Sequence, residues 1–260
     1  MQRADYAPLP PVLQVRDVSV RFGGVRALSR LSFDVQPGAV TALIGTNGSG
    51  KTTLFNVVAG NIDPFEGSVH FNGEDVTSLP QRERVARGLV RTFQQVRLFM
   101  QLTVLDNLLL GTPSVPGEDF VTPITRWRYV NRGEDENVSR VFDFMRSWKL
   151  LPLAHRLAGD LSYGEQKLVG IGRAVMARPK LLLVDEPLAG ITAKSVNDLL
   201  RVLEELTHGG CTVLLVEHNI EAVMQVARHV VVVHLGEKIA EGTPAEVSAH
   251  AKVREVYLGG

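Results

Sequence analysis

The chain has 260 residues, which is long enough for one large α/β domain with a sizeable core. Its 28 basic residues balance 28 acidic ones, so no global positive field attracts DNA or RNA, and we expect no nucleic-acid partner. A single cysteine, Cys211, rules out an internal disulfide framework and favours a reducing compartment.

No stretch of about 18 apolar residues occurs in the sequence, and prolines interrupt the N-terminal segment where a signal peptide needs an apolar run. We therefore expect neither a membrane span nor export by that route. Any link to a membrane is expected to come through a partner protein.

The N-terminal part is predicted to be rich in β-structure. Residues 12–22 and 31–45 alternate apolar and polar side chains, and residues 40–44 form a mostly apolar strand. A helix is predicted from Lys51, and turns with short strands follow over residues 60–76.

Residues 79–157 are predicted to be helical around a loop rich in Gly and Pro at residues 111–123. After them, short apolar runs alternate with helical segments, which is typical of a buried parallel sheet. These runs lie within residues 179–187, 211–218 and 229–237.

A phosphate-binding loop is predicted between the strand at residues 40–44 and the helix that follows it. Gly45, Gly50, Lys51 and Thr52 satisfy the pattern G-x-x-x-x-G-K-[ST] in the required strand-to-helix context. Its glycines let backbone N–H groups converge on phosphate oxygens, Lys51 supplies a positive charge, and the Thr52 hydroxyl suits Mg²⁺. A glycine-rich turn without a ligand is the weaker interpretation. The predicted phosphate-binding residues are Gly45, Thr46, Asn47, Gly48, Ser49, Gly50, Lys51, Thr52 and Thr53.

A second carboxylate site is predicted where the apolar run at residues 181–184 ends. Asp185 can hold Mg²⁺ through water, and Glu186 can act as the general base that polarises an attacking water. An apolar strand followed by a solvated Asp-Glu turn would be the better interpretation if the phosphate loop were absent. Together, the two motifs strongly indicate nucleotide binding, and small-molecule kinases, GTPases, helicases and transport ATPases all share them.

The stretch LSYGEQK, residues 161–167, predicts a helix start with Ser162 as the cap and Glu165 completing a capping box. An ordinary capped helix explains it on physical grounds alone. The stretch nevertheless resembles the LSGGQ signature of the ATP-binding subunits of ABC transporters, and this resemblance extends over residues 12–260. By that resemblance, Ser162 and Gly164 contact the γ-phosphate of ATP that is bound to a second ATP-binding subunit.

Three more residues match motifs of this family. Phe22 stands where an aromatic residue stacks on adenine, although a strand aromatic facing the core is the plain alternative. Gln94 resembles the glutamine that approaches the metal and the attacking water, with Gln95 adjacent to it. His218 resembles the histidine that reaches the γ-phosphate, although a histidine ending a buried strand is more often structural.

The family implies an α/β fold: a P-loop NTPase core with a mostly parallel sheet, an N-terminal antiparallel β-subdomain and an inserted α-helical subdomain. One ABC ATPase domain would cover residues 12–260. Its core with the β-subdomain would take residues 12–93 and 168–235, the helical subdomain with the signature residues 94–167, and a C-terminal extension residues 236–260.

Four positions depart from the family pattern. Thr46 replaces a proline in the phosphate loop, and Tyr163 and Glu165 replace a glycine and a glutamine of the signature. Thr192 stands where the family has Asp or Asn in a contact across the dimer. The effect of the last three on the ATPase rate stays open.

Within the family, four stretches resemble the ATPases of branched-chain amino-acid importers: residues 90–109, the long segment at residues 111–140 before the signature, residues 217–247 and residues 253–260. Related groups serve urea and other amides or export lipopolysaccharide, so these remain alternatives. A soluble ABC ATPase is less favoured, because the chain has neither a long coiled-coil insertion nor a second ATPase unit. A P-loop kinase would have no use for the signature.

The resemblance implies ATP and Mg²⁺ as cofactors, with Thr52, Gln94 and Asp185 at the metal and Lys51, Gln94, Glu186 and His218 as catalytic residues. Two ATP-binding subunits, identical or different, would pair head to tail on the cytoplasmic face of the inner membrane. Their partners would be transmembrane permease subunits and, indirectly, a solute-binding protein.

Arginines cluster around residues 82–97, which predicts either a solvated helix face or a surface that approaches headgroups or a partner loop. We expect Arg97, Leu98 and Phe99 to help dock the permease, since exposed apolar residues beside arginine suit an interface. The cluster contains Arg82, Arg84, Arg87, Arg91 and Arg97.

Overall fold

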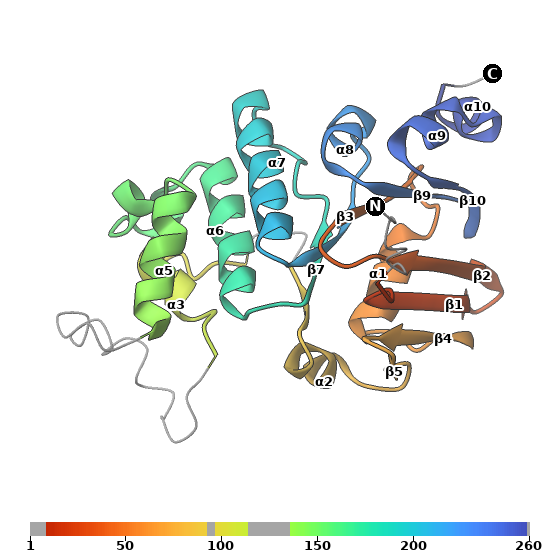
Figure 1. Cartoon of the computed structure of the whole chain (residues 1–260), viewed down its shortest axis with the longest axis horizontal. Coiled ribbons are helices and arrows are strands. Elements are labelled where there is room, and N and C mark those ends of the chain that lie inside the picture. Colours follow the sequence, from red (N-terminus) through yellow and green to blue (C-terminus); the bar gives the residue numbers. More distant parts are fainter. Residues whose placement is uncertain (1–8, 93–96, 114–135, 259–260) are drawn as a thin grey trace, which may run out of the picture.

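The computed structural model describes residues 9–92, 97–113 and 136–258 of the chain. In Figure 1, two β-sheets lie at one end of the molecule and a group of helices at the other. That group contains α3 (Val104–Leu109), α5 (Glu136–Ser147) and α6 (Tyr163–Met176).

The larger sheet has the strand order β10-β9-β3-β8-β7-β6, and all of its neighbouring strands run parallel except the β10–β9 pair. Every residue of β3, β7 and β8 is buried, as expected for parallel strands covered on both faces. The strands are β3 (Val40–Gly45), β6 (Leu89–Arg91), β7 (Leu181–Asp185), β8 (Thr212–Val216), β9 (His229–His234) and β10 (Glu237–Gly242).

The smaller sheet is antiparallel, in the order β2-β1-β4-β5. Its buried residues form one apolar cluster with α1 (Lys51–Ala59) and with one face of the larger sheet. Leu43 and Leu183 point into this cluster, whereas the neighbouring Ala42 and Leu182 point to the opposite face. The strands are β1 (Leu13–Phe22), β2 (Val25–Val35), β4 (Glu66–Phe71) and β5 (Glu74–Asp75).

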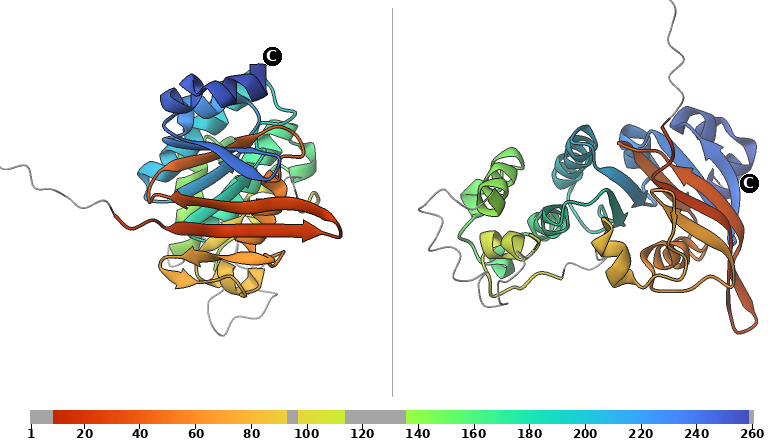
Figure 2. Two further views of the ribbon diagram at one scale, coloured as in Figure 1. Left: turned by 90° about the vertical axis from the view of Figure 1, so that its right-hand side faces the viewer. Right: turned by 60° about the horizontal axis from the view of Figure 1, so that its bottom comes forward.

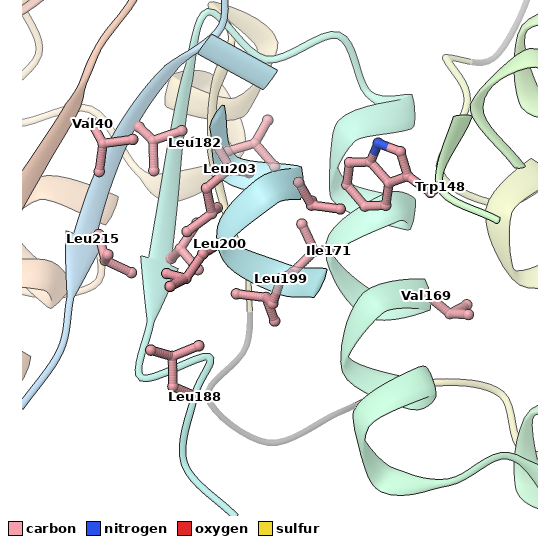
Figure 3. Packing of buried hydrophobic residues seen from close by; sticks show 14 of the residues in the cluster. Val40, Trp148, Val169, Ile171, Leu182, Leu188, Leu199, Leu200, Leu203 and Leu215 are labelled. Carbon is pink, nitrogen blue, oxygen red and sulfur yellow. The ribbon is translucent and has the colours of Figure 1, made fainter. Parts of the chain in front are cut away.

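The opposite face of the larger sheet packs against α7 (Ala193–His208). Figure 3 shows Leu199, Leu200 and Leu203 of α7 between the strands and α6, where Ile171 meets them. This second cluster continues into the helical group through Trp148, so one apolar core joins the sheet to α5 and α6.

The chain ends beside the larger sheet, where α9 (Pro244–Ala249) and α10 (Ala251–Leu258) pack near β10 (Figure 2). Helix α8 (Ile220–Val226) lies against α9 and β3. None of the helices in the described part of the chain is long and apolar enough to span a membrane.

The fold agrees with the predicted α/β class, but the structure differs from the sequence prediction in the segment from residue 79. A strand, β6, follows α2 (Gln81–Ala86) within the stretch that was predicted to be helical. Its three residues pair in parallel with Leu181–Leu183 of β7. So short an edge strand carries too little periodicity to be recognised, and its partner lies far away in the sequence.

The arginine cluster is not a uniformly solvated face. Arg84 is fully buried, and its guanidinium donates to the carbonyls of Val57 and Val58 at 2.7 and 2.8 Å. These carbonyls belong to the last turn of α1, where a positive charge interacts favourably with the negative end of the helix dipole. Leu98 is also buried, so the expected exposed apolar surface is limited here to Phe99 and Met100.

Candidate nucleotide-binding site

The predicted phosphate loop connects β3 to α1 in the structure. Gly48 and Gly50 have φ angles of 77° and 103°, in the left-handed region that favours glycine. A Cβ on Gly45 would lie 2.3 Å from the Val233 carbonyl oxygen, so only glycine fits that position. Helix α1 begins after Gly50 without a side-chain cap and without an acidic residue in its first turn. Its first N–H groups are therefore available to an anion.

Lys51 lies inside this loop. Its ammonium donates to the carbonyl oxygens of Gly45 at 2.8 Å and Thr46 at 2.9 Å. Burial lowers the pKa of Lys51, and the nearby charges of Glu186 and Asp185 oppose that shift. The Lys51 ammonium therefore holds the loop together through these two carbonyl oxygens. The same ammonium can turn from them to phosphate oxygens.

Asp185 ends β7 and is buried beside Arg91, which ends β6. The Arg91 guanidinium donates to the Asp185 carboxylate at 2.8 Å and to the Asn56 side chain at 2.6 Å, and it lies 5.6 Å from the Phe55 ring centroid. Burial raises the pKa of Asp185, whereas the hydrogen bond and charge of Arg91 lower it. Arg91 thus balances a carboxylate that would otherwise be isolated in the interior.

Glu186 follows directly and has a φ angle of 44°, which is uncommon for a residue with a side chain. Its backbone N–H donates to the Val216 carbonyl at 2.9 Å. Positions held in such conformations cluster at functional sites. The neighbouring sheet therefore fixes the direction in which the Glu186 side chain leaves the strand.

His218 comes two residues after β8, and its side chain is 55% exposed. Strand β8 lies between β3 and β7, so the carboxyl ends of three adjacent parallel strands bring the phosphate loop, the Asp185–Glu186 pair and His218 to one edge of the sheet. Ligands of open α/β sheets bind at this edge.

The signature stretch begins α6, and the predicted capping box is present. The Ser162 N–H and hydroxyl both donate to the Glu165 carboxylate, at 2.8 and 2.7 Å. Ser162 and Tyr163 are exposed, whereas Gly164 packs so closely that a Cβ would lie 2.6 Å from Ser195 Oγ. Thr192, one of the departures from the family pattern, caps α7 through a bond from the Ser195 N–H.

Phe22 ends β1 with 52% of its surface exposed. The interpretation of this residue as a core aromatic is therefore wrong, and its ring is accessible to a ligand. Gln94 and its neighbour Gln95 lie outside the described residues.

Sequence reasoning missed three residues of this region: Arg91, Lys167 and Glu217. Arg91 was predicted only as part of the arginine cluster. Lys167 belongs to the stretch LSYGEQK and Glu217 to the apolar run at residues 211–218, and no role was predicted for either. Glu217 is completely buried. The available sequence signal was its position directly after an apolar run, where a charged side chain that is buried needs hydrogen-bond partners.

Comparison with known proteins identifies the family. Residues 28–189 match the ABC transporter family model, and residues 237–260 match the model described as branched-chain amino acid ATP-binding cassette transporter. The chain belongs to the ABC transporter family. It is an ATPase cassette, the ATP-binding subunit of a transporter complex.

Curated relatives of this ABC subunit match over nearly the whole chain. The high-affinity branched-chain amino acid transport ATP-binding protein BraF of Pseudomonas aeruginosa is 36% identical, covering 96% of this chain and 98% of the relative. A probable branched-chain amino acid transport ATP-binding protein, LivG of Methanocaldococcus jannaschii, is 38% identical over 95% of this chain and 97% of its own length.

Solved ABC structures share the fold. One ATP-binding cassette in its ADP conformation superposes with a TM-score of 0.83 at 37% identity, covering 96% of this chain and all of the other. A nucleotide-free cassette gives a TM-score of 0.82 at the same identity and coverage. The predicted family, fold class and ATPase activity are thereby confirmed.

Proposed function

We propose that this ABC ATPase powers a membrane importer of branched-chain or other hydrophobic amino acids. The match of residues 237–260 to a branched-chain amino-acid transporter model carries the proposal, because that segment lies outside the ATP-binding match at residues 28–189. The names of the relatives support the same substrate class.

In the proposed mechanism, ATP binds at the edge of the sheet where β3, β7 and β8 end. Lys51 exchanges its contacts with the Gly45 and Thr46 carbonyls for β- and γ-phosphate oxygens, and the N–H groups at the start of α1 bind the same phosphates. Phe22 stacks on the adenine ring, for which its exposed position at the end of β1 is suited.

The donor set fits Mg²⁺. The ion prefers oxygen ligands, is commonly held by one or two carboxylates together with substrate phosphates, and here would take the Thr52 hydroxyl, Asp185 and Gln94. Among the described residues, no group of three or more His, Cys, Asp or Glu side chains could hold a metal ion by itself. Bound Mg²⁺ would neutralise charge on the transferring phosphoryl group.

Glu186 acts as the general base that takes a proton from the attacking water, and His218 donates to the γ-phosphate. Most of the rate enhancement comes from positioning and from the charge of Lys51 and the loop amides. Ser162 and Gly164 of a second ATP-binding subunit close the site, so that ATP binding brings two subunits together and hydrolysis releases them.

We place the subunit on the cytoplasmic face of the inner membrane, bound to transmembrane permease subunits that convert closure into alternating access. Phe99, which is 56% exposed and lies 5.9 Å from the Arg173 guanidinium, belongs to the surface that meets the permease.

Uptake of labelled leucine, isoleucine, valine and urea tests this proposal in cells that carry the parent gene, Lys51→Ala or the exposed control Lys252→Ala. We expect Lys51→Ala to lose uptake of the three amino acids while the protein still accumulates and the control transports normally. Loss of urea uptake alone would move the substrate class. Unchanged uptake of all four, in cells without a redundant importer, would overturn the import proposal and favour export.

A further inference from the structure

The four residues that follow β7, residues 186–189, form a turn that carries Glu186 at its start. Pro187 and Leu188 are buried, so backbone groups of the turn have little access to water. Buried backbone N–H and C=O groups need hydrogen-bond partners. Two buried charged side chains from distant parts of the sequence provide them here.

Lys167, on the second turn of α6, binds the carbonyl side. Its ammonium donates to the carbonyl oxygens of Glu186 at 3.2 Å, Pro187 at 2.9 Å and Ala189 at 2.6 Å. The three protons of a lysine ammonium thus meet three acceptors of one turn. Lys167 is only 5% exposed, so water cannot replace these bonds.

Glu217, which follows β8, binds the amide side. One carboxylate oxygen accepts from the Leu188 N–H at 2.8 Å, and the other accepts from the N–H groups of His218 at 3.1 Å and Asn219 at 3.5 Å. The side chain is fully buried. One carboxylate therefore holds both the turn after Glu186 and the start of the segment that carries His218.

The two charged side chains act on the same turn. Burial lowers the pKa of Lys167, and the charge of Glu217 is the larger of two carboxylate effects that oppose this shift, the other being that of Glu186. Lys167 binds carbonyl oxygens of residues 186–189, and Glu217 binds the Leu188 N–H of the same turn. The pair is thus a joint in which α6, residues 186–189 and the His218 segment hold one another in place.

We propose that Lys167 and Glu217 are positioning residues that hold Glu186 and His218 in the geometry for hydrolysis and link them to the signature end of α6. The inference rests on the proposed function, in which Glu186 and His218 serve one ATP while Ser162 of the same chain serves the ATP of the partner. Lys167 lies five residues after Ser162 on the same helix, so the joint connects the two ATP sites.

A purely structural role would give a different result from a positioning role. If the pair only stabilised the fold, the fraction of each variant that folds would hydrolyse ATP at the parent rate. A positioning role lowers kcat much more than the affinity for ATP, because the hydrogen bonds described for Lys167 and Glu217 go to residues 186–189 and 218–219 and not to the phosphate loop.

The test compares Lys167→Met with Lys167→Arg, which keeps the charge, and with Lys252→Met as a matched exposed lysine. We expect kcat of Lys167→Met to fall about tenfold or more while binding of a fluorescent ATP analogue stays within about twofold. Lys167→Arg should recover most of the rate. Should Lys167→Met fail to fold, Glu217→Gln, which keeps the shape of the side chain, provides the same comparison against Glu204→Gln.

Hydrogen exchange gives a second readout that needs no ATPase activity. In Glu217→Gln, and to a smaller extent in Lys167→Met, exchange of the Leu188 amide should accelerate about tenfold, while amides in β7 and β8 keep the parent rates. The control variants should show neither change.

Faster exchange together with a lower kcat would support the proposal. Parent-like exchange at Leu188 in Glu217→Gln would overturn it, and so would a parent-like kcat in folded Lys167→Met. A parent protein that binds ATP without hydrolysing it would contradict the proposed function instead, and the exchange measurement would still decide whether the joint holds the turn.

Discussion

Helices α1 and α6 both begin at predicted phosphate-binding motifs, but the N-terminus of α1 has no side-chain cap whereas that of α6 has a capping box. Helix α1 starts after Gly50 with no side-chain cap and no acidic residue in its first turn. Helix α6 starts with Ser162, whose N–H and hydroxyl are already bonded to the Glu165 carboxylate of the same helix.

Under the proposed function, the difference predicts two kinds of anion site. The α1 terminus has no side-chain cap and no acidic residue in its own first turn, so in the proposed mechanism it binds phosphate within a single subunit. At the α6 terminus the capping box already bonds the Ser162 hydroxyl to the Glu165 carboxylate, so in the proposed mechanism a phosphate from a second subunit must compete with Glu165. A monomer should therefore bind ATP through α1 alone, and α6 should matter only when two subunits close.

The largest effect is expected for Glu186→Gln, which removes the proposed base at a site that needs both helices. Phosphate release should slow by about a hundred- to ten-thousandfold, because general-base catalysis contributes at that level. ATP should still bind and should hold the subunits together, giving an ATP-dependent dimer in size-exclusion chromatography. A variant that still releases phosphate as fast as the exposed control Glu204→Gln would remove Glu186 from this role.

Arg91→Gln should show how much the buried Arg91 guanidinium, which bridges Asn56 of α1 and Asp185, contributes to stability near α1. Breaking this buried pair should lower the free energy of unfolding by about 3 kcal/mol near neutral pH. The matched surface variant Arg201→Gln, whose bond to Asp198 is exposed, should cost about 0.5 kcal/mol or less.

The loss should depend on pH in a defined direction. Burial already raises the pKa of Asp185 above its unfolded value, so stability is lost as pH rises through the folded pKa. Without Arg91 the pKa of Asp185 rises further, so the pH range over which the folded state loses stability extends to higher pH. Urea unfolding should therefore show a larger deficit at about pH 7.5 than at about pH 5. An equal deficit at both values would show that Arg91 does not balance Asp185.

Lys51→Met and Ser162→Ala should separate the two helix termini in the isolated subunit. Lys51→Met removes charge-assisted hydrogen bonds to phosphate, and the ATP affinity should fall by about 10- to 100-fold. Ser162→Ala should leave that affinity unchanged when measured by fluorescence titration at concentrations that keep the protein monomeric. A comparable loss in Ser162→Ala would mean that α6 contributes to ATP binding within its own chain.

The smallest effect is expected for Glu165→Gln, which keeps the capping geometry and removes the competing charge. Phosphate from the partner should then bind more readily at α6, so the ATP-dependent dimer should tighten by about two- to fivefold. Helix α9 offers the control, because Thr243 and Glu246 form the same capping box away from the site. Glu246→Gln should leave the dimer unchanged, and an identical shift in both variants would point to net charge rather than to α6.

Local patterns predicted much of this site. The strand and helix on either side of the glycine-rich loop, the Asp185 strand and the Ser162–Glu165 capping box depend on residues close together in the sequence, and each was present where expected. Arg91, Lys167 and Glu217 act on groups that only the fold brings near: Arg91 reaches Asp185 because β6 pairs with β7, and Lys167 reaches residues 186–189 because α6 packs beside them.

Such contacts leave no periodic signal in a single sequence. Strand β6 has three residues, and the exposure of Phe22 depends on where the β1–β2 hairpin ends relative to the core. In each of these cases, tertiary packing rather than local propensity determined the outcome.

The edge strand of the larger sheet, β10, affects how readily copies of the chain associate. Along its six residues it carries Glu237, Lys238 and Glu241, and Glu241 is bonded to both Lys238 and His229. Charged side chains on a border strand discourage the strand-to-strand addition that leads to aggregates. Such a border leaves contact between copies of the chain to other surfaces of the molecule.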